Sequence, residues 1–343
     1  MKKTFRLYNI PIPDRYEMDF IINLNKPAGI TSQDAVTKVK KTIKAKKAGH
    51  AGTLDPAATG VLLVCTNRAT RLASYFSDLD KEYRAVIKLG EVTDTQDAQG
   101  KVLEKSDSID VDESAIKSAL GAFEGETLQQ PPMYSALKHE GKPLYKYARQ
   151  GIDVPRKQRK ISIHKIELLD IDLPFAGFTV VCSKGTYIRT LCHDIGKKLG
   201  TGAHLFKLER TAIGPFSIKD SLSLEELSPL RKQEGFLNKG MYPDRKQGFL
   251  NKGMYPDRKQ GFLNKGVYTM DSALSWMPEY RVTDSQVGDV QNGVPVSISG
   301  SQDFLDSLAA SSGIRVKSPE GLLLAIGSFQ PIRKTVKMDV VFG

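Results

Sequence analysis

The stretch GHAGTLDPAATGVLLV, residues 49–64, places a single carboxylate, Asp55, in a segment that is otherwise apolar and rich in glycine. Gly52 and Gly60 flank it, and an apolar run follows. Asp-Pro pairs are common in turns, where the aspartate side chain can bond a nearby backbone amide. Alternatively, a carboxylate on a glycine-flanked loop can be held partly desolvated at a pocket edge and act as base or nucleophile. The stretch is not a phosphate-binding loop, because no Gly-Lys-Ser/Thr follows.

The composition is that of an ordinary globular protein. The chain has 343 residues, of which 40% are hydrophobic and 26% charged, and this length predicts two domains. Its three cysteines include no CxxC pair, which favours a reducing compartment. The longest apolar runs fall far short of the roughly 20 residues of a membrane helix, and the N-terminus lacks the apolar core of a signal peptide. We therefore expect a cytoplasmic protein that does not contact membranes.

The formal net charge of +11 indicates a polyanionic partner such as nucleic acid. More than half of this charge falls in residues 231–266, which hold nine Lys or Arg and three acids. The same residues form a tandem repeat, RKQEGFLNKGMYPD, RKQGFLNKGMYPD and RKQGFLNKGV. Glycines interrupt every copy, so the repeat predicts a solvated linker. The alternative is an RNA-touching arm, because Phe and Tyr are interleaved with basic residues.

Helical and strand patterns alternate before the repeat. Thr31 and Asp34 have capping-box spacing at the start of an amphipathic segment, and Tyr83 lies on the apolar face of an alternating segment. The expected helices are 31–44, 67–76, 112–123 and 187–200, and the expected strands are 19–24, 59–65, 81–90 and 178–182. After the repeat, a short helix over 271–278 precedes strands over 280–284, 313–318, 322–329 and 333–342, which favour a small β-barrel or sandwich.

Three further residue types are candidates for the site. Arg189 stands at a turn-to-helix start, where an arginine can pair with a carboxylate and hold it ionised; a surface position explains it equally well. Tyr83 is a candidate for the site, and packing in the core explains its position as well. The five histidines have no metal-ligand spacing, so we expect no metal site.

Six segments occur in order along the chain: NKPAGITSQDAV, GHAGTLDPAATGVL, KEYRAVIKLG, QQPPMYSALKHEGKPLYKYARQG, CSKGTYIRTLCHDIG and KLERTAIGPF. Together they resemble the bacterial tRNA pseudouridine-55 synthase family, TruB, over residues 20–218. The tail resembles, more weakly, the PUA-type RNA-binding domain of that family. The repeat and an N-terminal extension depart from the family pattern.

The resemblance implies an isomerase that converts uridine-55 in the T loop of tRNA to pseudouridine after flipping the base out of its stack. The N1–C1′ bond breaks, the uracil turns and C5 joins C1′. Nothing is added or lost, so the resemblance implies no cofactor and no metal. Asp55 matches the essential aspartate of the family, facing C1′ either as nucleophile or to assist loss of the C2′ proton. Both routes stay open at the level of sequence.

The resemblance also implies roles for other residues. Arg189 matches the arginine that pairs with the aspartate, and Tyr83 matches the tyrosine that stacks on the target base and serves as base in one route. Tyr187 and Leu208 match pocket-lining positions. His50 matches the histidine that enters the T loop and fills the space of the flipped base.

Two segments match supporting and RNA-contacting parts of the family. Lys26 and Pro27 match the KPxG segment, which supports the Asp55 loop, and Lys26 is counted among the substrate-binding residues. Residues 131–160 resemble the thumb-like insertion that clamps the T arm. This insertion is basic, and its tyrosines suit an RNA-contacting loop; packing within the insertion is the alternative.

We therefore expect an α+β fold in which a pseudouridine synthase domain, 18–230, has a mixed, largely antiparallel central sheet. The extension 1–17 precedes it, and the linker 231–266 leads to a β-barrel-like, PUA-like domain over 271–343. The expected partner is the T arm of tRNA, bound by a monomer without a protein partner. Two other functions stay open: an RNA-binding protein without activity, and a hydrolase that uses Asp55 to release uracil.

Overall fold

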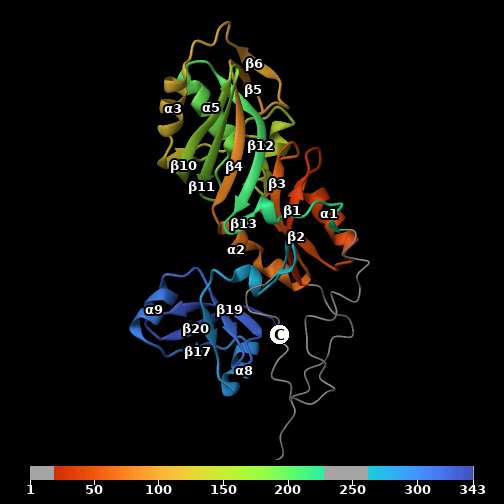
Figure 1. The fold of residues 1–343 in the computed structure, drawn as a ribbon, viewed down its shortest axis with the longest axis vertical. Coiled ribbons are helices and arrows are strands. Elements are labelled where there is room, and N and C mark those ends of the chain that lie inside the picture. The colour runs from red at the N-terminus through yellow and green to blue at the C-terminus, as the bar shows by residue number, and fades with distance from the viewer. Residues whose placement is uncertain (1–18, 228–261, 343) are drawn as a thin grey trace, which may run out of the picture.

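The structure, a computed structural model, describes residues 19–227 and 262–342. Figure 1 shows a larger part built on a long sheet and a smaller C-terminal part built on a second sheet. The expected extension 1–17 and most of the repeat lie outside the described residues. Within the two described ranges, no helix has both the length and the apolar character that a bilayer crossing needs.

The larger sheet is mixed and largely antiparallel, as the sequence predicts. Among the described residues its path runs β14 (Phe262–Asn264), β15 (Val267–Thr269), β1 (Phe20–Lys26), β3 (Thr59–Thr66), β12 (Ala203–Ile213), β4 (Lys81–Leu89), β11 (Phe175–Cys182), β10 (Arg159–Asp172) and β7 (Gly125–Gln129). Off this path, β2 (Ala48–Ala51) pairs with β3, and β13 (Phe216–Ser217) pairs with β12. β12 and β3 run parallel, with Arg210 beside Gly60. The predicted α+β fold class is therefore confirmed.

β4 and the first helix follow the patterns that predicted them. In β4 every second residue is buried, so Tyr83 points into the core while Arg84 faces solvent. Helix α1 (Ser32–Thr42) begins after Thr31, whose hydroxyl accepts from the Asp34 backbone N at 3.0 Å. The Asp34 carboxylate in turn accepts from the Thr31 backbone N at 3.0 Å. This reciprocal pair is the predicted capping box.

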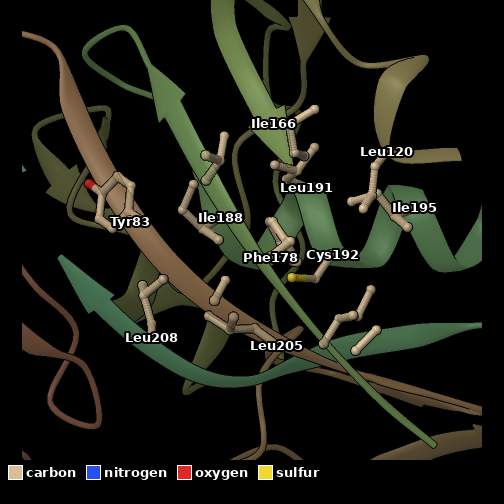
Figure 2. Close-up of a cluster of buried hydrophobic side chains, with 14 of the residues drawn as sticks. Tyr83, Leu120, Ile166, Phe178, Ile188, Leu191, Cys192, Ile195, Leu205 and Leu208 are labelled. Atoms are coloured by element: carbon tan, nitrogen blue, oxygen red, sulfur yellow. The ribbon is translucent and has the colours of Figure 1, made fainter. Parts of the chain in front are cut away.

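Two helices cover one face of the centre of the sheet. α3 (Glu113–Gly121) and α5 (Ile188–Leu199) pack on β4, β10, β11 and β12 through one buried apolar cluster. Figure 2 shows Tyr83 and Leu208 at one end of this cluster and Leu120 and Ile195 at the other. Shorter elements complete the larger part: η1 (Asn67–Leu72), α2 (Ala73–Asp78), β5 (Glu91–Thr93), β6 (Val102–Lys105), β8 (Lys138–His139), β9 (Lys142–Pro143), α4 (Leu144–Ala148) and η2 (Ile218–Asp220).

The end of the repeat is a strand and not a linker. β14 comprises residues Phe262–Asn264 of the third copy, and it pairs with β15, which pairs with β1. The short pairing segments gain backbone hydrogen bonds at the open edge of the sheet, which the glycine-rich local sequence does not reveal. The prediction that 231–266 is a linker is therefore wrong for its last residues.

The C-terminal part is a five-stranded sheet among the described residues, in the order β16 (Glu279–Arg281), β18 (Ile314–Lys317), β19 (Leu323–Gln330), β20 (Thr335–Val341) and β17 (Val296–Ser297). Four of these strands lie where the sequence predicts them. Helices α8 (Asp284–Gln291) and α9 (Gln302–Ala309) were not predicted. Their starts carried a signal, because Thr283 and Ser301 cap them. The predicted helix over 271–278 is only the short turn η3 (Ser272–Leu274).

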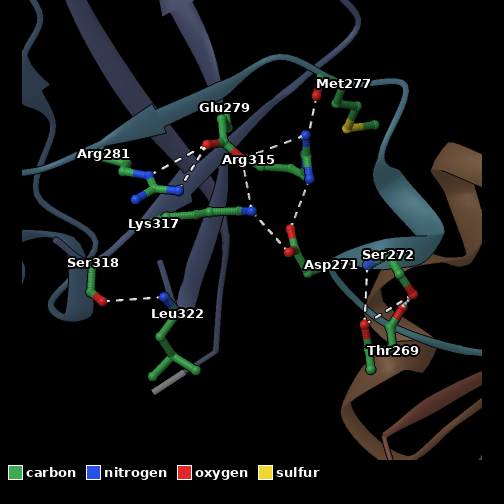
Figure 3. A network of polar contacts seen from close by, with 10 residues as sticks. All are labelled: Thr269, Asp271, Ser272, Met277, Glu279, Arg281, Arg315, Lys317, Ser318 and Leu322. Carbon is green, nitrogen blue, oxygen red and sulfur yellow. Dashed lines mark hydrogen bonds and ion pairs between the residues drawn. The ribbon is translucent and has the colours of Figure 1, made fainter. Parts of the chain in front are cut away.

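The two parts share a hydrophobic cluster and an ionic network. Ring centroids of Phe76, Phe216 and Trp276 lie 5.7 to 6.0 Å apart, in the same cluster as Ile326 of the C-terminal sheet. Figure 3 shows Asp271, which follows β15, facing the C-terminal strand β18. Its carboxylate accepts from Arg315 Nη1 at 2.9 Å and from Lys317 Nζ at 2.8 Å. These contacts fix the C-terminal sheet against the end of the larger sheet.

Candidate active site

Asp55 lies on the loop that joins β2 to β3. The geometry of the chain requires glycine at both flanking positions. Gly52 has φ +88 and Gly60 has φ +101, a region that L side chains rarely adopt. A Cβ on Gly60 would lie 2.2 Å from the backbone oxygen of Arg210. Only glycine therefore lets β3 approach β12 at this point, and the loop leaves the sheet where the two strands meet.

Arg189 contacts the Asp55 carboxylate through two of its nitrogens. Its Nε lies 2.9 Å from Oδ2, and its Nη2 donates to Oδ1 at 3.4 Å. The arginine stands in the first turn of α5 and is 5% exposed, whereas the aspartate side chain is 41% exposed. The pairing expected from the resemblance is therefore present, with a buried cation beneath a carboxylate that solvent can reach.

The Arg189 guanidinium also holds two other loops. Nη1 donates to the carbonyl of Thr95 at 3.1 Å, and Nη2 donates to the carbonyl of Tyr134 at 2.8 Å. The carboxylate of Asp97 lies 3.6 Å from Nη1. The sequence analysis did not identify this loop around Thr95. The available signal was its two closely spaced aspartates, Asp94 and Asp97.

Burial raises the pKa of the Asp55 carboxyl above its ordinary value. The Arg189 charge opposes this rise, and the nearby Asp97 charge adds to it. A raised pKa makes the ionised carboxylate more basic than a free aspartate, while the arginine favours the ionised form. This combination suits a base or nucleophile.

Lys26, the last residue of β1, supports the Asp55 loop. Lys26 is fully buried, and its Nζ donates to the carbonyls of Pro27 at 2.8 Å, Ile30 at 2.9 Å and Pro56 at 3.2 Å. Burial lowers the pKa of Lys26 to about 8, although the charge of Asp55 favours its protonated form. Lys26 therefore holds the residue that follows Asp55, through the Pro56 carbonyl, and its assignment to substrate binding stays a prediction.

Ser32 is a second support that sequence reasoning missed. Its Oγ donates to the carbonyl of Leu54 at 2.9 Å and accepts from the Leu54 amide at 2.8 Å. The first residue of α1 therefore pins the residue immediately before Asp55. The hydroxyl next to the predicted cap Thr31 was the only sequence signal.

Tyr83 and Leu208 lie on neighbouring strands at the end of the core cluster nearest this loop. Each is 8% exposed, and Leu208 pairs in register with Ala85, two residues along β4 from Tyr83. Burial raises the pKa of the Tyr83 phenol, and a hydrogen bond and charge from Arg210 oppose this rise. The phenol is thus packed in the core and also touches a cation beneath the Asp55 loop.

Tyr187 caps α5 and joins the insertion to the site. Its amide donates to Gln129 Oε1 at 2.8 Å, and Gln129 Nε2 donates back to its carbonyl at 3.0 Å. Gln129 ends β7, immediately before the predicted insertion 131–160. The base of the insertion is therefore fixed two residues before Arg189.

Within the insertion, the tyrosines make internal contacts. The Arg149 guanidinium lies 5.4 Å from the ring centroid of Tyr145, and Lys142 Nζ lies 5.5 Å from that of Tyr147. Packing inside the insertion is therefore real for both rings. The cations that cover them remain on an exposed basic segment.

His50 lies on β2, opposite Val64 of β3. The side chain is partly buried, and its Nδ1 has no hydrogen-bond partner among the described residues. Burial and the charge of Arg210 lower the pKa of His50, which favours the neutral imidazole. Across the described part of the chain, no group of three or more His, Cys, Asp or Glu side chains is arranged to hold a metal.

Family models match most of the described chain. Residues 40–188 match the N-terminal domain of TruB family pseudouridylate synthase, and residues 189–274 match the C-terminal domain of tRNA pseudouridylate synthase B. A relative named tRNA pseudouridine synthase B, from Clostridium tetani, is 50% identical over 217 residues, which cover 63% of this chain and 75% of the relative. A relative of the same name from Photobacterium profundum is 41% identical over 282 residues, covering 82% and 83%.

The fold is also similar to solved structures. A chain from the structure titled "Structure of H/ACA RNP bound to a substrate RNA containing 2'-deoxyuridine" superposes with a TM-score of 0.66 at 26% identity. The superposition covers 95% of this chain and 86% of that chain, so it includes both sheets.

Proposed function

The chain belongs to the TruB family of pseudouridylate synthases, and we propose that it acts on uridine-55 in the T loop of tRNA with Asp55 as the reacting carboxylate. It is a tRNA pseudouridine synthase, an isomerase. The observation that carries the role of Asp55 is its two-nitrogen contact with the buried Arg189. The Asp55 loop also packs beside Tyr83, because Leu54 and Ala58 belong to the same buried cluster as that ring.

In this proposal the reaction breaks the N1–C1′ bond and forms a C5–C1′ bond within one nucleotide. The C5 proton is lost and N1 gains a proton, so atoms balance without a second substrate. Asp55 either attacks C1′ and is later displaced by C5, or removes the C2′ proton and returns it. Both routes need an ionised carboxylate near the sugar. Arg189 supplies the cation that favours ionisation, against the burial that raises the pKa.

The target uridine must leave its stack before Asp55 can reach its sugar. Such flipping costs roughly a few kcal/mol. We assign the compensating contacts to Tyr83 beneath the flipped base and to His50, whose neutral imidazole stands beside the loop. Tyr187 and Leu208 line the same pocket.

Two surfaces of the protein are assigned to bind the tRNA outside the T loop. The basic insertion 131–160 clamps the T arm, and it is fixed to the site through the Tyr134 carbonyl and Arg189. The C-terminal sheet acts as a PUA-type RNA-binding domain over 271–343, and residues 18–230 form the catalytic domain. The packing of Phe76 and Phe216 against Trp276 supports a fixed orientation of the two domains. We propose that the chain works in the cytoplasm as a monomer, without a protein partner.

One product assay separates this function from its alternatives. The purified chain is incubated with a tRNA transcript whose uridines carry tritium at C5, and tritium release, free uracil and mapped pseudouridine are measured. We expect tritium release matched by pseudouridine at position 55 and no free uracil. Free uracil would indicate a hydrolase, and binding without release would indicate an inactive RNA-binding protein. Activity of the purified chain alone also tests the absence of a protein partner.

A further inference from the structure

Arg210 on β12 is the largest side chain that the described fold buries completely, at 1% exposure. Among the described residues, no carboxylate lies within ion-pair distance of it. Burying a guanidinium is unfavourable unless its donors are well satisfied. The position of those donors therefore indicates what this arginine does.

The donors of Arg210 reach both ends of the loop that carries Asp55. Nε donates to the carbonyl of Val61 at 2.7 Å, and Nη2 donates to the carbonyl of Gly52 at 3.0 Å. Gly52 is the first residue after β2, and Val61 is the third residue of β3. The planar guanidinium of Arg210 thus bonds the backbone at both ends of the Asp55 loop.

The backbone of Arg210 fixes the same loop a second time. Gly60 lies in register with Arg210 in the parallel pair of β3 and β12, and the contact leaves no room for a Cβ. On its other side, Arg210 lies in register with Tyr83 of β4. Its charge and a side-chain hydrogen bond to Tyr83 lower the pKa of that phenol, against the larger effect of burial. Arg210 therefore lies between the carboxylate loop and the tyrosine.

We propose that Arg210 is a positioning residue for the isomerisation, which fixes both ends of the Asp55 loop and the Tyr83 ring relative to one another. This inference rests on the proposed function, because it assigns Asp55 and Tyr83 to the same bound uridine. Arg210 does not contact the substrate. It acts through the geometry of the two groups that do, and small displacements of reacting groups reduce rates strongly.

The test is Arg210→Lys, which keeps the charge but loses the planar fork, so one amine cannot serve both carbonyls. We expect the single-turnover rate of pseudouridine formation to fall on the order of 10- to 100-fold, with the tRNA Kd within about twofold of wild type. A residue needed only for stability would lower the melting temperature and leave the rate of the folded enzyme unchanged. The split between rate and binding is therefore the informative readout.

A second variant approaches the same contact from the loop. Gly52→Ala strains a backbone at φ +88 and turns its carbonyl away from Arg210, while its Cβ would meet Arg210 Nη1 at an ordinary 3.5 Å. We expect a smaller rate loss, and we expect the double variant with Arg210→Lys to lose less than the product of the two single losses. The matched control is Gly293→Ala, at φ +75 in open space on the C-terminal part, whose effect should multiply independently.

Each outcome decides the inference. If the wild-type chain is active and the Arg210→Lys rate lies within twofold of the wild-type rate, the inference is overturned. It is also overturned if the rate loss of the double variant equals the product of the losses of Gly52→Ala and Arg210→Lys. If Arg210→Lys does not fold, an unchanged rate in Gly52→Ala overturns it. A wild-type chain that forms no pseudouridine overturns the proposed function and this inference together, so the two failures are distinguishable.

Discussion

Replacing Arg189 by lysine tests how much the two-nitrogen contact with Asp55 contributes to the reaction. Lysine keeps the charge but presents a single ammonium, so it cannot reproduce contacts at 2.9 Å to Oδ2 and 3.4 Å to Oδ1 together with bonds to two carbonyls. The change therefore removes at least one hydrogen bond to a carboxylate without removing the local charge.

The structure sets the expected magnitude. A hydrogen bond to a charged group is worth about 1.5–3 kcal/mol. Asp55 is 41% exposed, so water replaces part of the lost contact and we take the lower end, about 1.5–2 kcal/mol. Since 1.36 kcal/mol corresponds to a tenfold change, the single-turnover rate should fall about 10- to 30-fold. Loosening of the loops at Thr95 and Tyr134 adds to this loss.

The assay uses enzyme in excess over tRNA labelled with tritium at uridine C5, and it measures the rate of tritium release. Arg84→Lys is the matched control, because Arg84 follows Tyr83 on β4 but faces solvent. Circular dichroism and tRNA affinity establish that both variants are folded and bind. An Arg189→Lys rate within twofold of Arg84→Lys would refute the reasoning.

Three further results are expected. The acid limb of the rate profile should lie above the ordinary aspartate pKa of 3.8, because burial raises the pKa of Asp55, and Arg189→Met should move it to still higher pH by removing the opposing charge; a limb that does not move contradicts this. Lys26→Met should slow turnover. Between pH 8 and 10.5 the unfolded wild-type chain binds more protons at Lys26 than the folded chain does, so its unfolding free energy rises with pH, and Lys26→Met should reduce this rise. An unchanged rise in denaturant titrations contradicts this. Trimming the repeat to one copy that keeps Phe262–Asn264 should leave the rate unchanged and weaken tRNA binding only at low salt, and a rate loss that persists at high salt contradicts this.

Local patterns predicted the elements whose signals are local. The alternation of β4, the cap of α1 and the helix expected over 187–200 each depend on residues close together in the chain, and all three are present. The resemblance added what pattern alone left open, namely that Arg189 lies against Asp55. On sequence alone, that arginine had an equal chance of lying on the surface.

The elements that the sequence missed depend on partners far away. β10 reads as mixed polar and apolar residues, and its 14-residue length follows from its pairing with β7 and β11. β14 is a strand only because β15 lies beside it at the edge of the sheet. Neither pairing leaves a clear period in the local sequence.

The missed members of the site have the same physical origin. Arg210 reads as one more basic residue of a basic chain, and its burial arises where β12 meets β3, about 150 positions away. Asp97 becomes a neighbour of Asp55 only through Arg189. Candidate residues were therefore found where a motif surrounds them, and missed where tertiary contact alone defines them.

The most direct test of Asp55 as the reacting carboxylate compares Asp55→Asn with the wild-type chain in pseudouridine mapping of one purified tRNA. Asparagine keeps the size of the side chain and can still accept a hydrogen bond from Arg189, but it supplies neither the charge nor the nucleophilicity of a carboxylate. We predict one pseudouridine, at position 55, with the wild-type chain, and none with Asp55→Asn at matched folding and with tRNA affinity within a few-fold. Pseudouridine formed by Asp55→Asn at the wild-type rate would contradict the assignment.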